Sequence, residues 1–296
     1  MARFSSAEKQ AKRIGRSLHK SGAVQSLRTA NGYAGALALY GQWLEERGIQ
    51  LGLATRDNAV AYLDYRSEQV GQAALNLDRQ AINSFRTATL GQDDVIGMVR
   101  SEATTALKSR AYTPEQIQLV MEHQSPANRF ATELAAAAGL RTHELLTLRP
   151  VAERAPSDRD WDPLTHMKIQ GNRYTVVGKG GLVRTVKIPY AMAEALEKLR
   201  LETPRTVLDR KIRYVQHYNL PGGNNLSKSF SDASKRALGW STGIHGLRHT
   251  YAQQRMRLLC QAFQTRNGRM GRDRALQIVS HEMGHLRPEI TLVYLR

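Results

Sequence analysis

Residues 281–296 read HEMGHLRPEITLVYLR, and they decide between two very different kinds of protein. The first five residues fit the H-E-x-x-H pattern, in which two histidines one helical turn apart bind zinc and the glutamate activates water. The same stretch places Tyr294 nine residues after His285. The rest of the chain has to indicate whether the histidine pair or the tyrosine carries the function.

The zinc interpretation meets obstacles within the stretch itself. Gly284 weakens a helix that would have to run through both histidines, and Pro288 ends any such helix soon afterwards. A third ligand would have to follow His285, but the only acidic residue downstream is Glu289. The eleven residues after His285 are also too few for another ligand-bearing helix. A zinc metallopeptidase is therefore a remote alternative.

The composition favours a globular protein that binds a polyanion. The chain has 296 residues, enough for two ordinary domains, and an apolar fraction of 41%. Lys and Arg number 43 against 26 Asp and Glu, a formal charge of +17, so nucleic acid is the first candidate for the partner. Residues 1–110 hold 15 basic and 10 acidic side chains, and residues 111–296 hold 28 and 16. The basic excess therefore covers both parts of the chain.

The single cysteine and the absence of long apolar runs indicate the compartment. Cys260 excludes an internal disulfide and is typical of a reducing cytosol, and we interpret it as a small buried hydrophobe. No apolar run approaches the roughly 20 residues that span a membrane. The polar start, MARFSSAEKQAKR, lacks the apolar core of a signal peptide. We expect a soluble cytoplasmic protein with no membrane partner.

Residues 1–108 predict a helical domain. From about residue 5 to residue 85 the apolar residues recur at helical spacing, which predicts about four helices. One predicted face consists of Tyr33, Leu37, Tyr40, Trp43 and Leu44. A linker is expected near residues 100–112, and Thr113 with Gln116 then predicts a capped helix start. The second domain is therefore expected to span residues 112–296.

The second domain is expected to contain helices and a small sheet. Residues 128–140 and 141–148 predict two helices. Three alternating segments then follow, which are HMKIQ (166–170), RYTVVGKGG (173–181) and VRTVKIP (183–189). They predict a three-stranded antiparallel sheet with Lys179 in its second turn. From Tyr190 onward we expect helices, so the predicted fold class is mainly α with a small three-stranded antiparallel β-sheet (α+β).

Three further clusters hold residues suited to chemistry on an anion. The stretch GLRTHELLTL places Arg141 and Glu144 just after an Ala-rich helix. The stretch GKGG places Lys179 between glycines, where a flexible ammonium group can reach a phosphate. The stretch HGLRHTYA places His245 and Arg248 on one side of a helical turn, a titratable imidazole beside a permanently charged guanidinium. Each cluster taken alone also has an ordinary structural interpretation.

Taken in chain order, these motifs resemble tyrosine recombinases of the phage-integrase type. The resemblance rests on GLRTHELLTL, GKGG, HGLRHTYA, and MGH followed nine residues later by the tyrosine of TLVYL, and it covers nearly the whole chain. It implies a helical core-binding domain over residues 1–108 and a catalytic domain over residues 112–296, which together form a DNA clamp. It also implies site-specific recombination through a covalent 3′-phosphotyrosine intermediate.

The resemblance assigns the bond-making and proton-transfer steps to three residues. Tyr294 is implied as the nucleophile that attacks the DNA phosphodiester. A phenol with an ordinary pKa of about 10 needs a proton acceptor or local positive charge to attack at neutral pH, and His245 is the candidate acceptor. Lys179 is the implied general acid for the 5′-oxygen leaving group, a role that contributes on the order of 10²–10⁴ in rate.

The remaining implied site residues bind the phosphate. Arg141 and Arg248 are fork-shaped donors that can clamp the charge of the transition state without a metal. His285 is expected to hydrogen-bond the phosphate as well. Glu144 is assigned a supporting role, in which it orients Arg141 or a neighbouring helix.

The resemblance also implies the partners of the protein. The expected partner is double-stranded DNA carrying specific recombination sites, on which a homotetramer brings two sites together. Accessory DNA-bending or directionality proteins are possible further partners. No cofactor, metal or ATP is expected, because the energy of the broken bond is stored in the protein–DNA link. The location implied is the cytoplasm, on the nucleoid when DNA is bound, for an integrase of a mobile genetic element.

Several alternatives and departures stay open. A recombinase-derived DNA-binding protein without catalysis, or a type IB topoisomerase, would have similar residues. The 36 residues between Arg248 and His285 exceed those of compact family members, so residues 249–284 are expected to hold a basic insert, either a DNA-contacting loop or a surface elaboration. The chain also ends two residues after Tyr294, where many relatives continue into a tail helix.

Overall fold

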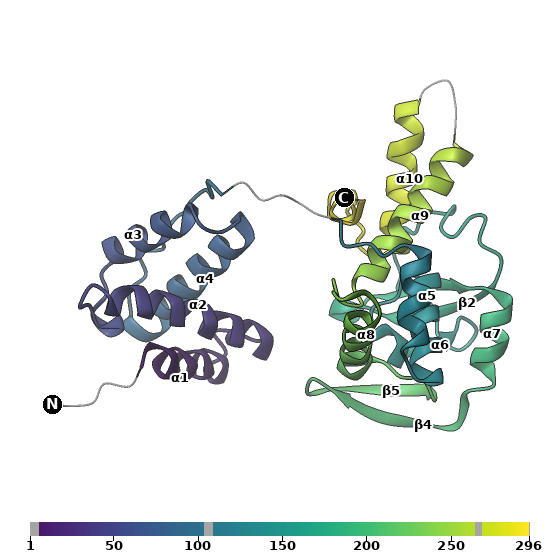
Figure 1. The fold of residues 1–296 in the computed structure, drawn as a ribbon, viewed down its shortest axis with the longest axis horizontal. Coiled ribbons are helices and arrows are strands. Elements are labelled where there is room, and N and C mark those ends of the chain that lie inside the picture. The colour runs from purple at the N-terminus through teal and green to yellow at the C-terminus, as the bar shows by residue number, and fades with distance from the viewer. Residues whose placement is uncertain (1–5, 104–108, 264–267, 296) are drawn as a thin grey trace. The chain divides into compact units, whose positions relative to one another are not determined.

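The structure is a computed structural model that describes residues 6–103, 109–263 and 268–295. The chain divides into two compact units, Met1–Ala106 and Leu107–Arg296, each with its own core. Figure 1 shows both units along the colour gradient of the chain. The expected linker near residues 100–112 lies partly outside the described residues.

The first unit is helical. Its elements are α1 (Ala7–Lys20), α2 (Leu27–Glu45), the 3₁₀ turn η1 (Leu51–Leu53), α3 (Arg56–Ser67) and α4 (Gln72–Leu90). Local signals start these helices: Thr55 accepts a hydrogen bond from the Asn58 N–H while the Asn58 side chain accepts one from the Thr55 N–H. The predicted apolar face of α2 is buried, and its Tyr40 and Trp43 pack against Tyr62 of α3.

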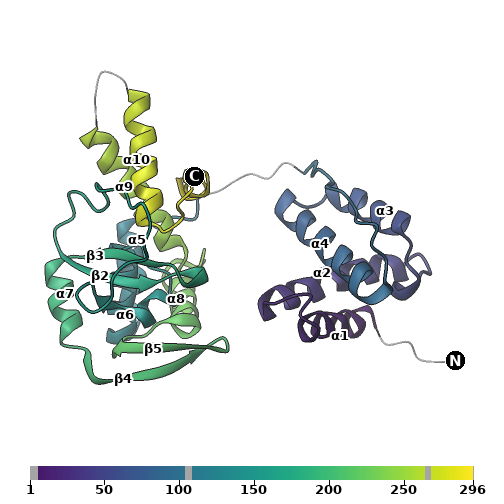
Figure 2. The same ribbon diagram turned by 180° about the vertical axis from the view of Figure 1, so that it is seen from behind.

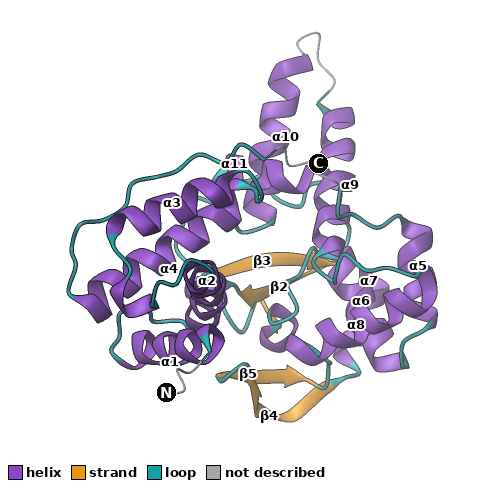
Figure 3. Ribbon diagram, turned by 60° about the vertical axis from the view of Figure 1, so that its left-hand side comes forward, coloured by secondary structure: helices purple, strands orange, loops and turns teal. Residues whose placement is uncertain are grey.

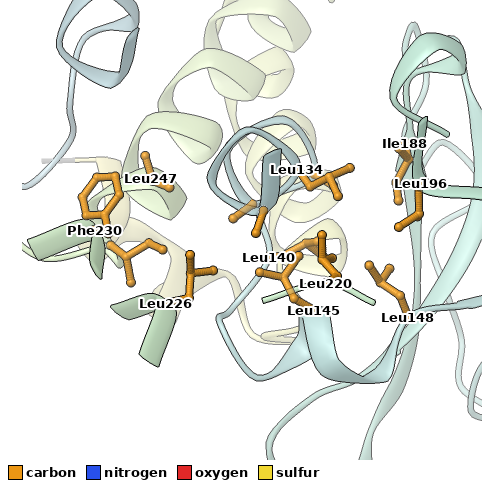
Figure 4. Close-up of a cluster of buried hydrophobic side chains, with 14 of the residues drawn as sticks. Leu134, Leu140, Leu145, Leu148, Ile188, Leu196, Leu220, Leu226, Phe230 and Leu247 are labelled. Atoms are coloured by element: carbon orange, nitrogen blue, oxygen red, sulfur yellow. The ribbon is translucent and has the colours of Figure 1, made fainter. Parts of the chain in front are cut away.

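The second unit surrounds a small sheet with helices. The helices are α5 (Pro114–Glu122), α6 (Pro126–Ala137), α7 (Tyr190–Glu197), α8 (Gly223–Leu238), α9 (Gly246–Ala262), α10 (Gly268–Glu282) and α11 (Pro288–Leu292). The expected capping box of Thr113 and Gln116 starts α5. Figure 4 shows part of the core, in which Leu134 of α6, Ile188 and Phe230 of α8 belong to one apolar cluster.

The sheet is antiparallel and three-stranded, and the protein is mainly helical, as predicted. Its strands are β1 (Arg149–Pro150), β2 (Asn172–Val177) and β3 (Val183–Ile188), in the order β1–β2–β3. The predicted second and third strands are present, but the predicted first strand, residues 166–170, is wrong. This segment is a turn in which His166 and Lys168 have positive φ, because tertiary hydrogen bonds hold His166 to Thr185 and Glu282.

A second sheet was not predicted. Strands β4 (Arg200–Asp209) and β5 (Ile212–Tyr218) form a hairpin where only helices were expected (Figures 2 and 3). Its two-residue turn consists of Arg210 and Lys211, both with positive φ. Such turns normally carry Asn or Gly, so the residues that signal a hairpin in a sequence are missing here.

The expected insert within residues 249–284 consists of helix rather than loop in its described part. Helices α9 and α10 lie side by side and project from the rest of the second unit (Figures 1 and 2). Leu259 of α9, Ile278 and Val279 of α10, and Met283 directly after α10 belong to a separate apolar cluster. Residues 264–267, between the two helices, lie outside the described residues. None of the described helices is long and apolar enough to cross a membrane.

Candidate active site

A buried carboxylate, Glu144, organises the site. Helix α6 ends just before Gly139, whose φ of 59° turns the chain so that Arg141 and the 3₁₀ turn η2 (Glu144–Thr147) follow at once. The Glu144 side chain is fully buried. Its Oε2 accepts from the Arg141 backbone N–H at 2.7 Å, and its Oε1 accepts from the Arg141 guanidinium at 2.8 Å. The expected supporting role of Glu144 toward Arg141 thus has a geometric basis.

Three guanidinium groups share this one carboxylate. Arg184 of β3 donates to Glu144 Oε2 at 2.8 Å, and an Arg248 nitrogen lies 3.9 Å from the same oxygen. Burial alone would raise the pKa of Glu144, but Arg184, Arg248 and Arg141 together outweigh it and hold the pKa well below the ordinary value. Glu144 is therefore ionised, and the cluster around it keeps an excess of positive charge.

Carbonyl groups at helix ends hold the two buried arginines. Arg248 donates to the carbonyls of Gly139 and Met283, the latter at 3.0 Å, and Arg184 donates to the Glu282 carbonyl at 2.7 Å. These acceptors follow the C-terminus of α6 and close the C-terminus of α10, where unpaired carbonyls concentrate negative charge. The fold thus directs the negative ends of two helices at two guanidiniums.

Arg184 was missed in the sequence, although a signal was present. In the strand VRTVKI the buried positions alternate, so Arg184 shares the inward face with Val186 and Ile188. A charged residue at an inward strand position requires a buried partner. That partner, Glu144, belongs to a different segment, so the pairing was not readable from spacing.

Tyr294 lies among the site histidines. It belongs to the 3₁₀ turn η4 (Val293–Leu295), and 9% of its surface is exposed. Its hydroxyl oxygen is 3.0 Å from His245 Nε2. The ring centroids of His249 and His285 lie 4.6 Å and 5.0 Å from the Tyr294 ring, and Arg248 Cζ lies 5.8 Å from its centroid. The Tyr294 phenol therefore has the His245 imidazole within hydrogen-bonding distance and the Arg248 guanidinium close to its ring.

The histidines of the site are held neutral. Burial, followed by the charge of Arg248, lowers the pKa of His245 to about 4 and that of His285 to about 3. The neighbouring His249 has its pKa lowered to about 4, first by burial and then by Arg110. His285 is further fixed by Thr291 of α11, whose Oγ1 lies 2.9 Å from His285 Nδ1. At neutral pH a neutral imidazole can accept a proton.

The turn between β2 and β3 carries Lys179. Its backbone is closed by a 2.7 Å hydrogen bond from the Gly178 N–H to the Leu182 carbonyl. A Cβ built on Gly178 would lie 3.7 Å from the Arg141 guanidinium, so this turn approaches the site. The side chain of Lys179 lies outside the described part of the structure, and its expected role is therefore a proposal.

The three polar residues of HEMGH have separate partners. His281 Nδ1 accepts from the Asp162 backbone N–H, Glu282 pairs with Arg255, and His285 lies against Tyr294. Within the described residues, no group of three or more His, Cys, Asp or Glu side chains is arranged to hold a metal ion. The motif that suggested zinc is thus divided among three environments.

Seven described side chains, drawn from several stretches of the chain, form one cluster. They are Arg141, Glu144, Arg184, His245, Arg248, His285 and Tyr294. It combines a tyrosine hydroxyl, a neutral imidazole and several cations, which suits nucleophilic attack on an anionic centre.

No protein-family model and no curated protein matches the chain. Solved structures do match over nearly its whole length. The XerH site-specific recombinase bound to difH substrate is 17% identical, with a TM-score of 0.56 over 99% of this chain and 82% of that one. The Tn1549 transposon integrase with circular-intermediate DNA is 15% identical, with a TM-score of 0.53 over 99% and 96%.

A lambda integrase fragment (residues 75–356 of that protein) bound to a core site gives a similar result. It is 17% identical, with a TM-score of 0.56 over 96% of this chain and 93% of that one. Identities this low show a common architecture. The chain therefore has the fold of these site-specific recombinases and integrases.

Proposed function

We propose that the protein is a site-specific DNA recombinase that cleaves and rejoins strands through a covalent 3′-phosphotyrosine. The observation that carries this proposal is the 3.0 Å contact between the Tyr294 hydroxyl and His245 Nε2, next to arginines anchored on Glu144. The solved structures with the same fold include recombinases and integrases bound to DNA, which supports the same substrate class.

The charge around Glu144 suits a phosphodiester. One carboxylate faces three guanidiniums, so an added anion would balance charge that the protein leaves in excess. Burial and the neighbouring Arg141 lower the pKa of Arg248 to about 10. Arg248 is still charged at neutral pH, and a bound phosphate would relieve this electrostatic cost. Arg141 and Arg248 clamp the non-bridging oxygens in the proposed reaction, and His285 donates a further hydrogen bond.

The proposed cleavage step exchanges one phosphodiester for another. The Tyr294 oxygen attacks phosphorus while its proton passes to His245 Nε2, and the bond from phosphorus to the 5′-oxygen breaks. Lys179 gives a proton to that leaving oxygen. Because the new phosphotyrosine retains the energy of the broken bond, the reversal needs no ATP and no metal.

The rest of the proposed machinery follows from charge and organisation. Both units carry basic excess, and they are proposed to clamp duplex DNA, with the first unit as core-binding domain. Most contacts would be to phosphates, so binding should weaken steeply with salt. We propose a homotetramer on two sites in the cytoplasm, with accessory DNA-bending or directionality proteins, serving a mobile element.

One observation favours a second candidate, a DNA-binding protein that does not cleave. Arg248 has no exposed surface, and its two terminal guanidinium nitrogens already donate to backbone carbonyls. A phosphate can reach it only after Tyr294 or its neighbours move. If DNA does not open the site, the chain would bind its sequence and leave the strand intact.

Covalent trapping tests the proposal. Nicked suicide duplexes that carry the sequences flanking the gene are mixed with protein, and covalent complexes are resolved on denaturing gels. We expect a shifted band that is lost in Tyr294→Phe and kept in the matched control Tyr190→Phe, whose exposed side chain starts α7. Tight binding with no band would favour the binding-only candidate, and a band from Tyr294→Phe would refute the assigned nucleophile.

A further inference from the structure

Glu282, the second residue of the HEMGH motif, has a side chain saturated with hydrogen bonds. It is 1% exposed, and burial, which would raise its pKa, is outweighed by Arg255, so the carboxylate is ionised. Arg255 donates to Oε1 at 2.6 Å and to Oε2 at 2.8 Å. The Tyr251 hydroxyl donates to Oε2 at 2.9 Å, and the His166 backbone N–H donates to Oε1 at 2.8 Å.

These four bonds fasten three segments together at one point. Glu282 ends α10, Arg255 and Tyr251 belong to α9, and His166 belongs to the turn that was expected to be a strand. Arg255 also donates to the Met167 carbonyl at 3.1 Å, and His166 Nε2 lies 3.1 Å from the Thr185 carbonyl of β3. The carboxylate thus fixes the end of α10 against α9 and the turn beside β3.

The backbone at the same point holds the site arginines. The Glu282 carbonyl accepts from Arg184, and the next carbonyl, Met283, accepts from Arg248. Gly284 then reverses the chain with a φ of 69°, and His285 follows. A movement at residue 282 would therefore be transmitted directly to two guanidiniums and to His285.

A second route leads from Glu282 to the same arginine. The Tyr251 ring, whose hydroxyl donates to Glu282, packs so closely on Gly139 that a Cβ there would lie 2.6 Å from the ring. The Gly139 carbonyl accepts from Arg248. Glu282 thus influences both carbonyls that accept from Arg248. Met283 follows it directly in the chain, and Gly139 packs against the Tyr251 ring that donates to it.

We propose that Glu282 is a positioning residue, whose carboxylate, through the backbone carbonyls of residues 139, 282 and 283, sets the orientation of Arg184 and Arg248. Its catalytic consequence rests on the proposed function, but the positioning itself does not. Glu282 touches no reacting atom. It acts through the arginines, as a support for groups that bind the phosphate.

Arginine side-chain NMR tests the positioning in the free protein. In ¹⁵N–¹H spectra of arginine side chains, the Nε–H signals of Arg184, Arg248 and Arg255 are assigned with lysine variants. We expect Glu282→Gln to shift or broaden the Arg184 and Arg248 signals as well as that of Arg255. Tyr251→Phe is a milder variant that keeps the carboxylate, and it should shift the Arg248 signal by less than Glu282→Gln does.

The matched control is Asp162→Asn. Asp162 is a buried carboxylate that pairs with Arg274 of α10, so it also joins α10 to the 162–168 segment, but it makes no bond to the site carbonyls. We expect this variant to leave the Arg184 and Arg248 signals unchanged. The proposal is overturned if Glu282→Gln moves the Arg255 signal alone, or if Asp162→Asn moves all of them equally.

Trapping kinetics test the catalytic consequence. On the suicide duplex, loss of folded protein lowers the fraction of enzyme trapped, whereas misplaced arginines lower the rate constant. A displacement of about 1 Å can cost on the order of 10²-fold in rate. We therefore expect Glu282→Gln to lower the rate constant of trapping by about that factor and to leave the final fraction of trapped enzyme unchanged. Asp162→Asn should keep the parent rate constant.

The two proposals fail in different ways. If the parent protein traps no DNA, the proposed function fails, and the arginine spectra still decide the positioning. If the parent traps DNA and Glu282→Gln traps it with the parent rate constant, the positioning role in catalysis is refuted while the function stands.

Discussion

Each unit buries a carboxylate beside arginine, yet the two carboxylates respond in opposite ways. In the first unit Asp78 of α4 faces Arg66, which donates at 3.0 Å, and burial outweighs this partner and raises the pKa of Asp78. In the second unit Glu144, which is fully buried, faces three guanidiniums and its pKa is lowered. In the first unit the single guanidinium of Arg66 balances the charge of Asp78, so the two form a structural ion pair. Three guanidiniums create an excess of charge, which suits the binding of an anion.

The largest expected effect comes from removing each carboxylate charge. Glu144→Gln would leave three guanidiniums clustered without a counter-charge, and breaking such a buried pair costs about 3–5 kcal/mol. Asp78→Asn strands only Arg66, which retains some exposure to water, so we expect a smaller loss of about 1–3 kcal/mol. Urea unfolding of both variants measures the difference. Equal losses would contradict the distinction between pair and cluster.

A smaller effect is expected when the fork of one arginine is removed but its charge is kept. Arg184→Lys cannot reproduce donation to Glu144 and to the Glu282 carbonyl together, so we expect a loss of about 1.5–3 kcal/mol. Arg66→Lys replaces a single donation to Asp78 and should cost about 1 kcal/mol. Unfolding in urea provides the comparison, and an Arg184→Lys variant as stable as Arg66→Lys would show that the fork geometry is unimportant.

The stabilities of the two units are also expected to diverge with pH. His245 and His285 have folded pKa values of about 4 and 3, below the ordinary 6.5, so their contribution is complete above pH 6.5 and is lost as the pH falls toward those values. The pH dependence of the Asp78 contribution has the opposite sign. Its pKa is raised in the folded state, so its contribution to stability grows as the pH falls toward its unfolded pKa near 3.8.

Tryptophan fluorescence can follow each unit separately between pH 7.5 and about pH 5. Trp43 reports on the first unit and Trp161 and Trp240 on the second, so Trp43→Phe isolates the second. We expect the second unit to lose more stability on acidification, and a double variant, His245→Asn with His285→Asn, to reduce that loss. Parallel behaviour of the two units would contradict the assignment of neutral buried histidines.

The elements that were predicted correctly are those specified by neighbours in the chain. The capping box of Thr113 and Gln116 starts α5 where expected, because both partners lie within one helical turn. The hairpin of β2 and β3 follows from alternation on either side of a glycine-containing turn. In such elements the deciding contacts are only a few residues apart.

The elements that were missed depend on distant partners. Residues 166–170 alternate like a strand, but His166 is held by Glu282 and Thr185, and the segment turns instead. The hairpin of β4 and β5 has Arg210 and Lys211 where a turn signal would normally stand. In both cases local preference was overridden by contacts that spacing does not show.

For the site, the sequence by itself determined the inventory: a tyrosine, histidines, a lysine and arginines, in an order that resembles one family. Only the tertiary structure decided how they are held. It added Arg184 to Glu144, and it made Glu282 a junction of three segments. The physical reason is that a buried charge must find its partners in space, and the partners of Arg184 and Glu282 named here lie from 27 to 116 positions away in the chain.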